Sequence, residues 1–200
     1  MDLPAGFDYL PEFVSEEEER QYVDFAREQQ LSPFVFRGNP SKRVVLNYGV
    51  NLDYEHKVPY LDDAIPALFT PLLARVAGVL DVPVERMVEL LITNYPPGAT
   101  INWRRDSRPF EAVAAVSLLS DCDLKLRPAP TKSERRTPIT TVRAERRSMY
   151  VLTGPARTAW MHRVPPVDET RMSITLRTVR PEWDVVGTAR PDGVPLHFDR

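Results

Sequence analysis

Two stretches of sequence decide the fold of this chain: LITNYPPGATINWRRD at residues 91–106 and RRSMYVLTGPARTAWMHRVPPVDETRMSITLR at residues 146–177. In the first, an apolar run ends at Tyr95, a Pro-Pro-Gly turn follows, and a new extended segment carries Arg104 and Asp106. Side chains two residues apart share one face of a β-strand. We therefore expect Arg104 and Asp106 to lie side by side on one face of a sheet.

The second stretch carries His162, Arg171 and Arg177. His162 follows Asp106 by 56 positions, and the two arginines follow His162 by nine and fifteen. Their spacing within an alternating segment puts both guanidinium groups on one face of a strand. Such a face suits the binding of a dicarboxylate.

Asp106 and His162 also have the spacing of a metal site. A non-haem iron(II) centre needs two imidazoles and one carboxylate, usually as His-x-Asp followed by a distant His. Arg104 stands where the first histidine of that pattern would lie. A guanidinium has no lone pair to donate, so Arg104 is no metal ligand. We expect it to pair with Asp106 or with a bound carboxylate in the place of the metal.

With these residues in view, the chain resembles the AlkB family of nucleic-acid dealkylating oxygenases and their small-molecule relatives. The similarity extends from about Leu10 to Pro181 and rests on motifs in a fixed order: Tyr95-x-Pro-Gly, residues 110–122, residues 147–154, Trp160-x-His162 and residues 171–177. The resemblance implies a double-stranded β-helix, or jelly roll, of antiparallel strands flanked by N-terminal helices, in the α+β class.

The resemblance also implies roles for single residues. Asp106 and His162 correspond to metal-ligand positions. The contacts of the co-substrate 2-oxoglutarate correspond to four residues: Thr93, Tyr95, Arg171 and Arg177. Thr93 replaces an asparagine that the family usually has two residues before the tyrosine, so the pocket departs from the family pattern at a second position.

Local patterns agree with the expected jelly roll. Ser15 and Glu18 have the spacing of a capping box for a helix that ends at about Gln29. Apolar residues at helical spacing predict a second helix over Pro66–Leu80. From Val88 onward, short alternating segments with Pro and Gly at the breaks are typical of an antiparallel barrel. Trp103 alternates away from Arg104 and is expected to fill core.

Composition limits the remaining alternatives. A chain of 200 residues with 42% hydrophobic residues can bury one good core, so we expect a single domain over residues 1–200. The apolar runs are shorter than a bilayer span and the N-terminus lacks a signal-peptide pattern, which predicts a cytoplasmic protein without a membrane partner. Cys122 is the single cysteine and is expected to be buried and structural.

Charge gives little support to a nucleic-acid partner. The net charge is −2 and the isoelectric point is about 6.0, so no overall basic field attracts a phosphate backbone. Basic residues cluster between Lys132 and Arg147, but without interleaved aromatic side chains for base stacking. We interpret this cluster as a solvated loop, and nucleic acid stays an open alternative.

Three functions are compatible with these residues. The first is an enzyme without iron or another cofactor, in which Arg104, Asp106 and His162 carry out proton transfer on a small anionic substrate. The second is an oxygenase that uses Fe(II) and 2-oxoglutarate with Asp106 and His162 as its only protein ligands. The third is a binding protein without catalytic activity. The sequence does not name a substrate.

Overall fold

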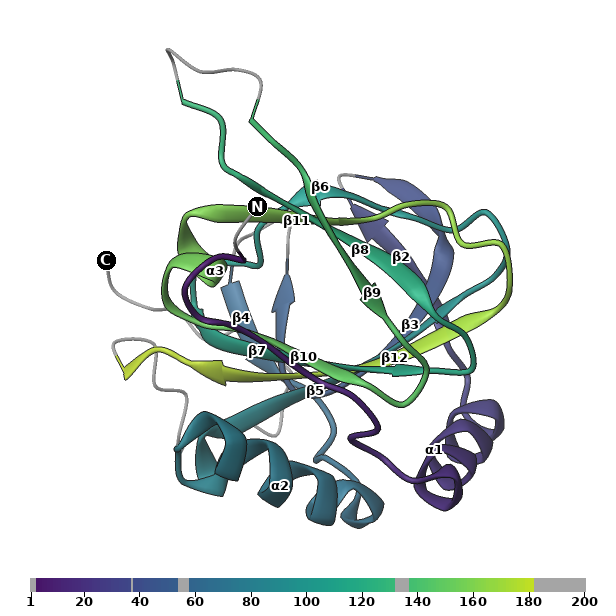
Figure 1. Ribbon diagram of the computed structural model, residues 1–200. Coiled ribbons are helices and arrows are strands. Elements are labelled where there is room, and N and C mark those ends of the chain that lie inside the picture. The colour runs from purple at the N-terminus through teal and green to yellow at the C-terminus, as the bar shows by residue number, and fades with distance from the viewer. Residues whose placement is uncertain (1–2, 37, 54–57, 132–136, 182–200) are drawn as a thin grey trace.

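The computed structural model describes residues 3–36, 38–53, 58–131 and 137–181. In these residues, antiparallel strands form two sheets that face each other, and two longer helices cover the outer side of the larger sheet (Figure 1). None of the helices in the described ranges is long and apolar enough to cross a membrane.

The larger sheet has eight strands. Their order in space is β1 (Phe7–Leu10), β10 (Met149–Leu152), β7 (Phe110–Leu118), β12 (Arg171–Val179), β5 (Met87–Tyr95), β3 (Asn39–Asp53) and β2 (Ser32–Phe36), and β4 (Val58–Leu61) pairs with β3. The smaller sheet has four strands in the order β6 (Ile101–Arg104), β11 (Trp160–Val164), β8 (Cys122–Pro128) and β9 (Thr140–Ala144). From β5 onward the chain passes repeatedly between the sheets, which confirms the predicted jelly roll.

Both predicted helices are present. α1 (Glu16–Glu28) begins at a capping box in which Ser15 and Glu18 each accept a hydrogen bond from the other's backbone N–H. α2 (Thr70–Leu80) begins later than predicted, because residues 67–69 form a 3₁₀ turn, η1 (Ala67–Phe69). Pro71 lacks the N–H that an α-helical bond to residue 67 would need, which explains the tighter first turn. The described residues also contain two short helical segments, η2 (Val84–Arg86) and α3 (Gly154–Thr158).

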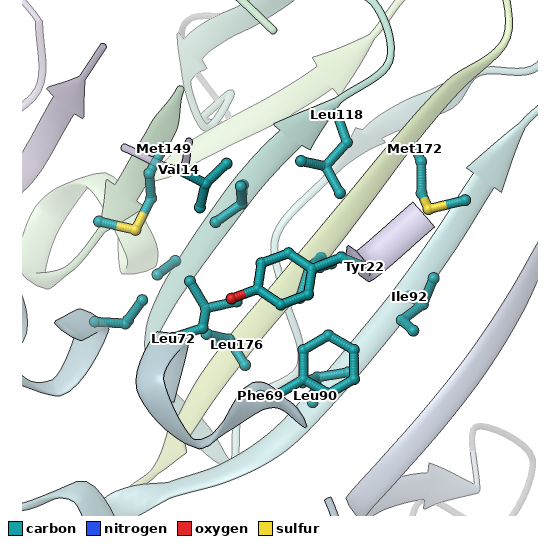
Figure 2. Close-up of a cluster of buried hydrophobic side chains, with 14 of the residues drawn as sticks. Val14, Tyr22, Phe69, Leu72, Leu90, Ile92, Leu118, Met149, Met172 and Leu176 are labelled. Atoms are coloured by element: carbon teal, nitrogen blue, oxygen red, sulfur yellow. The ribbon is translucent and has the colours of Figure 1, made fainter. Parts of the chain in front are cut away.

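The main hydrophobic core lies between the larger sheet and the helices. Figure 2 shows Tyr22 of α1 beside Phe69 and Leu72, packed over Leu90 of β5 and Leu176 of β12. The rings of Tyr22 and Phe69 stack with their centroids 5.1 Å apart. A second cluster fills part of the space between the two sheets and includes the buried thiol of Cys122, as predicted. The larger sheet is therefore covered on both faces.

The strand β12 separates these two environments. All nine of its residues are buried. Met172, Ile174 and Leu176 belong to the core beneath the helices, whereas Ser173, Thr175 and Arg177 line the space between the sheets. Alternation along the strand thus directs polar side chains to the interior of the barrel.

Two local predictions were wrong. Asp106 does not share a strand face with Arg104, because β6 ends at Arg104 and Asp106 lies in the loop that follows. Trp103 is only half-buried and lies outside both hydrophobic clusters. The guanidinium of Arg127 covers its ring at 4.3 Å from the ring centroid, so a cation–π contact replaces core packing.

Candidate functional site

Pairing of β6 with β11 brings three of the predicted site residues together inside the barrel. His162 lies directly opposite Arg104 across this strand pair. Asp106 reaches back from the loop after β6, and its Oδ2 atom lies 3.7 Å from Nε2 of His162. Its Oδ1 atom lies 3.9 Å from Nη2 of Arg104. The expected pairing of Arg104 with Asp106 is therefore present but long, and the Arg104 side chain is 25% exposed.

Arg177 of β12 is the stronger partner of Asp106. Its Nη2 donates to Oδ1 of Asp106 at 2.9 Å, and its Nη1 donates to Oε2 of Glu89 at 2.7 Å. All three side chains are at least nine-tenths buried. One guanidinium thus bridges two buried carboxylates, the arrangement that best offsets the cost of removing such charges from water.

These neighbours set the charges of Asp106 and His162. Burial alone would raise the pKa of Asp106, but Arg177, followed by His162, Arg104 and Arg157, outweighs it and holds that pKa well below its usual range. Burial lowers the pKa of His162 to about 4, against the opposing effect of Asp106 and with further lowering by Arg104 and Arg177. At neutral pH the carboxylate is charged and the imidazole is neutral.

Glu89 is a member of this group that the sequence did not single out. It lies on β5, where Glu89, Thr93 and Tyr95 follow at even spacing and so share one face. Burial raises the pKa of Glu89, while Arg177 acts to lower it. With its amide oriented to satisfy both donor and acceptor, Asn47 donates to Oε1 of Glu89 at 2.9 Å. The sequence did contain a signal for this residue, because Glu89 is a charged residue within the otherwise apolar start of β5.

Arg171 lies at the other end of β12 in a different environment. Its side chain is 1% exposed and its guanidinium carbon lies 4.9 Å from the centroid of the Tyr95 ring. Its Nε donates to Oγ of Ser117 at 3.1 Å. Within the described residues no carboxylate comes within ion-pair distance of Arg171, and no contact joins it to Arg104. No carboxylate of those residues therefore neutralises its positive charge.

A small cavity of about 40 Å³ connects all the predicted site residues except Arg171, which does not line it. It is lined by six of them: Thr93, Tyr95, Arg104, Asp106, His162 and Arg177. That volume holds only a few water molecules. A ligand with several carbon atoms therefore requires a lining side chain to move, and Arg104 is partly exposed and held by a long ion pair.

The residues present do not fit an iron centre with three protein ligands. Asp106 and His162 offer two donors, whereas Arg104, opposite His162, carries a guanidinium that has no lone pair. One oxygen of Asp106 is also engaged by Arg177. Within the described residues no cluster of three His, Cys, Asp or Glu side chains forms a metal site. His56 and His197, which received no role from the sequence, lie outside those residues.

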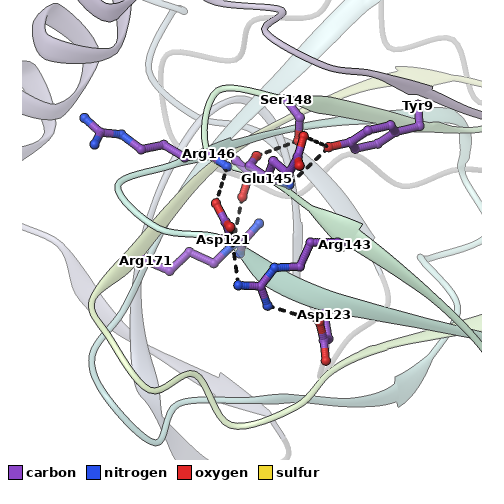
Figure 3. A network of polar contacts seen from close by, with 9 residues as sticks. Tyr9, Asp121, Asp123, Arg143, Glu145, Arg146, Ser148 and Arg171 are labelled. Carbon is purple, nitrogen blue, oxygen red and sulfur yellow. Dashed lines mark hydrogen bonds and ion pairs between the residues drawn. The ribbon is translucent and has the colours of Figure 1, made fainter.

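The basic cluster near residue 143 is compensated by acidic side chains. Arg143 pairs with Asp121 and Asp123 at 3.3 and 3.1 Å, as Figure 3 shows. Arg146 pairs with the buried carboxylate of Glu19 at 2.8 Å. Arg147 pairs with Glu16 at 3.4 Å. The other members of the cluster, Lys132, Arg135 and Arg136, lie outside the described residues.

Comparison with known proteins agrees with this fold. Residues 6–190 match the family model of the 2OG-Fe(II) oxygenase superfamily. The solved structure of OsALKBH1 has a TM-score of 0.71 at 12% identity, covering 89% of this chain and 99% of its own. A Pseudomonas putida prolyl-4-hydroxylase has a TM-score of 0.59 at 15% identity, covering 88% of this chain and 92% of its own. No curated protein sequence matches the chain.

At these identities the two solved structures show a shared fold alone, whereas the family model covers most of the sequence. The antiparallel jelly roll, with its helices on the larger sheet, is the fold that the sequence motifs implied. The chain therefore belongs to the 2OG-Fe(II) oxygenase superfamily and has an AlkB-like fold.

Proposed function

We propose that this protein carries out proton transfer on a small anionic substrate without an iron centre of three protein ligands. The supporting observation is the arrangement around Asp106. A carboxylate kept charged by Arg177 lies 3.7 Å from a neutral imidazole, and Arg104, whose guanidinium cannot bind a metal, lies opposite that imidazole across the β6–β11 pair. A neutral imidazole can accept a proton, and a charged carboxylate beside it can stabilise the imidazolium that forms.

His162 is the proposed proton acceptor. With its own proton on Nδ1, the neutral ring can take a proton from the substrate at Nε2, and Asp106 then stabilises the imidazolium that forms. Arg104 contributes to lowering the pKa of His162. A substrate anion bound to Arg104 offsets that effect, which moves the pKa upward, closer to neutrality, where a general base is most effective.

Arg104 is the proposed stabiliser of developing negative charge. Removal of a proton from a carbon beside a carbonyl or carboxylate leaves the electron pair as an enolate, and a guanidinium beside that oxygen lowers its energy. Return of the proton from His162 to another carbon completes an isomerisation without oxidant or metal. Elimination and ring closure can use the same two groups. Decarboxylation releases CO2 and leaves the electron pair of the broken C–C bond as an enolate, so it needs only the guanidinium of Arg104 and a proton from water.

Arg171 is the proposed anchor for a carboxylate of the substrate. A buried guanidinium lacking a carboxylate among its described neighbours favours an anion from solution. We expect Arg171→Leu to weaken binding of a dicarboxylate such as 2-oxoglutarate by about 2 to 5 kcal/mol. Titration calorimetry with the wild type and the variant measures this loss, and unchanged binding would assign Arg171 a purely structural role.

The test of the reaction uses candidate 2-oxo acids and unsaturated dicarboxylic acids, followed with and without chelator and with and without oxygen. We expect turnover that neither chelator nor oxygen removal changes, and that His162→Ala and Arg104→Gln each abolish. Arg20→Gln is the matched control, because Arg20 is an exposed residue of α1 paired with Glu17. Turnover that requires oxygen and consumes 2-oxoglutarate would overturn the proposal.

The second candidate is an oxygenase with Asp106 and His162 as its only protein ligands. It is favoured by the close approach of these two side chains and by the superfamily, whose members are named for Fe(II) and 2-oxoglutarate. Iron(II) titration under anaerobic conditions tests it. We expect weak binding by the wild type and at least tenfold tighter binding by Arg104→His, since residue 104 already lies opposite His162. Stoichiometric iron on the wild type would favour the oxygenase.

The third candidate, a binding protein without catalytic activity, uses the same arginines. It predicts anion binding that depends on Arg171, together with an absence of turnover in every condition of the reaction test.

A further inference from the structure

A larger arginine-rich pocket lies outside the cavity between the sheets. Its volume is about 890 Å³, and it is formed by the loop after β6, the C-terminal part of α3 and the residue after β12. Four arginines line it: Arg105, Arg108, Arg157 and Arg180. Asp106 lines both this pocket and the interior cavity, so the two spaces lie on either side of one residue.

Backbone carbonyl groups position these arginines. Arg105 Nη1 donates to the carbonyl of Thr158 at 2.8 Å, and Arg180 Nε donates to the carbonyl of Arg108 at 3.0 Å. The backbone N–H of Arg180 also donates to the carbonyl of Pro109 at 2.8 Å. A neutral carbonyl fixes the direction of a guanidinium without cancelling its charge, so the positive charge remains to attract an anion.

Arg157 is the buried member of the group. Its side chain donates from Nη2 to the carbonyl of Ser107, and the residue is only 4% exposed. Its Nε is buried and has no hydrogen-bond partner in the described part of the chain. Burial lowers the pKa of Arg157; Asp106 opposes this, whereas Arg177 and Arg180 add to it. An incompletely bonded, buried cation among other cations needs a compensating anion.

The pocket differs in this respect from other arginine sites of the protein. Arg20, Arg86 and Arg143 each form an ion pair at 2.7, 2.9 and 3.1 Å with a nearby carboxylate. Among the described residues, by contrast, no carboxylate lies within ion-pair distance of any of the four arginines that line the pocket. Asp106 offsets part of the charge of Arg157, but it is already bonded to Arg177.

We propose that this pocket binds the phosphate groups of a small molecule that carries at least two negative charges. Guanidinium groups match the oxygens of a phosphate in paired hydrogen bonds, and a multiply charged group compensates several arginines at once. A single carboxylate would leave most of that charge uncompensated. The described lining contains no aromatic side chain on which a base can stack, which favours a small ligand over a nucleic-acid strand.

This inference goes beyond the proposed reaction and does not depend on it. Arg108 and Arg180 line the outer pocket but not the cavity that holds His162 and Arg104. Loss of phosphate binding in variants of these two residues therefore leaves the proton-transfer proposal untouched. Failure of His162→Ala to affect turnover would likewise leave the phosphate site untouched.

The experiment measures binding of inorganic pyrophosphate to the full chain by titration calorimetry at constant ionic strength. We expect saturation at one site and at least tenfold weaker binding by the double variant Arg108→Gln and Arg180→Gln. The matched control is Arg20→Gln with Arg27→Gln, which removes the same charge from exposed positions on α1 that are paired with Glu17 and Asp24. We expect this control to bind within twofold of the wild type.

Three results would overturn the proposal. One is the absence of saturable pyrophosphate binding at millimolar concentration. Another is equal weakening in the control variant, which would show only a general effect of net charge. The third is binding of single-stranded oligonucleotides that is lost in the Arg108 and Arg180 variant while pyrophosphate fails to saturate, which would assign the pocket to nucleic acid instead.

Discussion

Arg171 and Arg177 occupy the same strand, point into the same barrel and are both buried, yet they have opposite surroundings. Across the β5–β12 pair, Arg177 lies opposite Glu89, whereas Arg171 lies opposite Tyr95. Arg177 bonds to two carboxylates, and Arg171 stacks on an aromatic ring and bonds to a hydroxyl. Arg177 is thus compensated by the protein itself, whereas no carboxylate of the described residues pairs with Arg171. Burial of an arginine therefore does not by itself show whether the residue stabilises the fold or binds a ligand.

The largest expected effect is the loss of stability on replacing Arg177. Arg177→Met removes the common partner of Glu89 and Asp106 and leaves two carboxylates buried without it. We expect the free energy of unfolding to fall by about 3 to 5 kcal/mol, as measured by urea denaturation. The triple variant with Glu89→Gln and Asp106→Asn should recover part of this loss. A loss below about 1 kcal/mol for the single variant would show that Arg177 contributes no essential compensation.

The next effect is the loss of stability as the pH falls. The pKa of His162 is about 4 in the folded protein against 6.5 for a free histidine, so the unfolded chain binds a proton that the folded chain does not. Stability conferred by the neutral imidazole is therefore complete above about pH 6.5 and declines toward pH 4. The lowered pKa of Asp106 acts in the same direction, and its contribution is lost at still lower pH.

This pH dependence can be isolated with His162→Gln, which removes the titrating group. Between about pH 7 and pH 4.5 we expect the free energy of unfolding of the wild type to fall by roughly 2 kcal/mol more than that of the variant. Denaturant titrations at each pH measure the difference. The contributions of carboxylates that both proteins share cancel when the two curves are subtracted. If the free energies of unfolding of the two proteins fall in parallel with pH, then His162 has an ordinary pKa in the folded protein and is protonated at acid pH.

Local signals in the sequence were sufficient for much of this fold. The capping box at Ser15 predicted the start of α1, and strand alternation correctly placed Arg171 and Arg177 on one face. Such features depend on neighbours within a few residues. Trp103 was misjudged because alternation shows that two faces differ but not which face of the smaller sheet is covered.

The partners within the site depend on contacts that are distant in sequence. Glu89 and Arg177 are 88 residues apart, and only the register of β5 against β12 makes them a pair. In the sequence, Glu89 is an isolated charged residue in an apolar strand, with no sign of its partner. The resemblance to oxygenases predicted that Arg177 contacts 2-oxoglutarate. In the structure, Arg177 forms ion pairs with Glu89 and Asp106 of the protein itself.

The smallest expected effect sharpens the comparison most. Arg171→Met replaces a buried charge that has no carboxylate partner among the described residues with an apolar side chain of similar length. The cost of burying the charge disappears together with one hydrogen bond to Ser117 and the contact with Tyr95, and these changes oppose each other. We expect the free energy of unfolding to change by less than about 1 kcal/mol, with either sign, in the urea experiment used for Arg177→Met. A loss as large as that of Arg177→Met would mean that the protein compensates both arginines alike, and the anion anchor proposed for Arg171 would lose its physical basis.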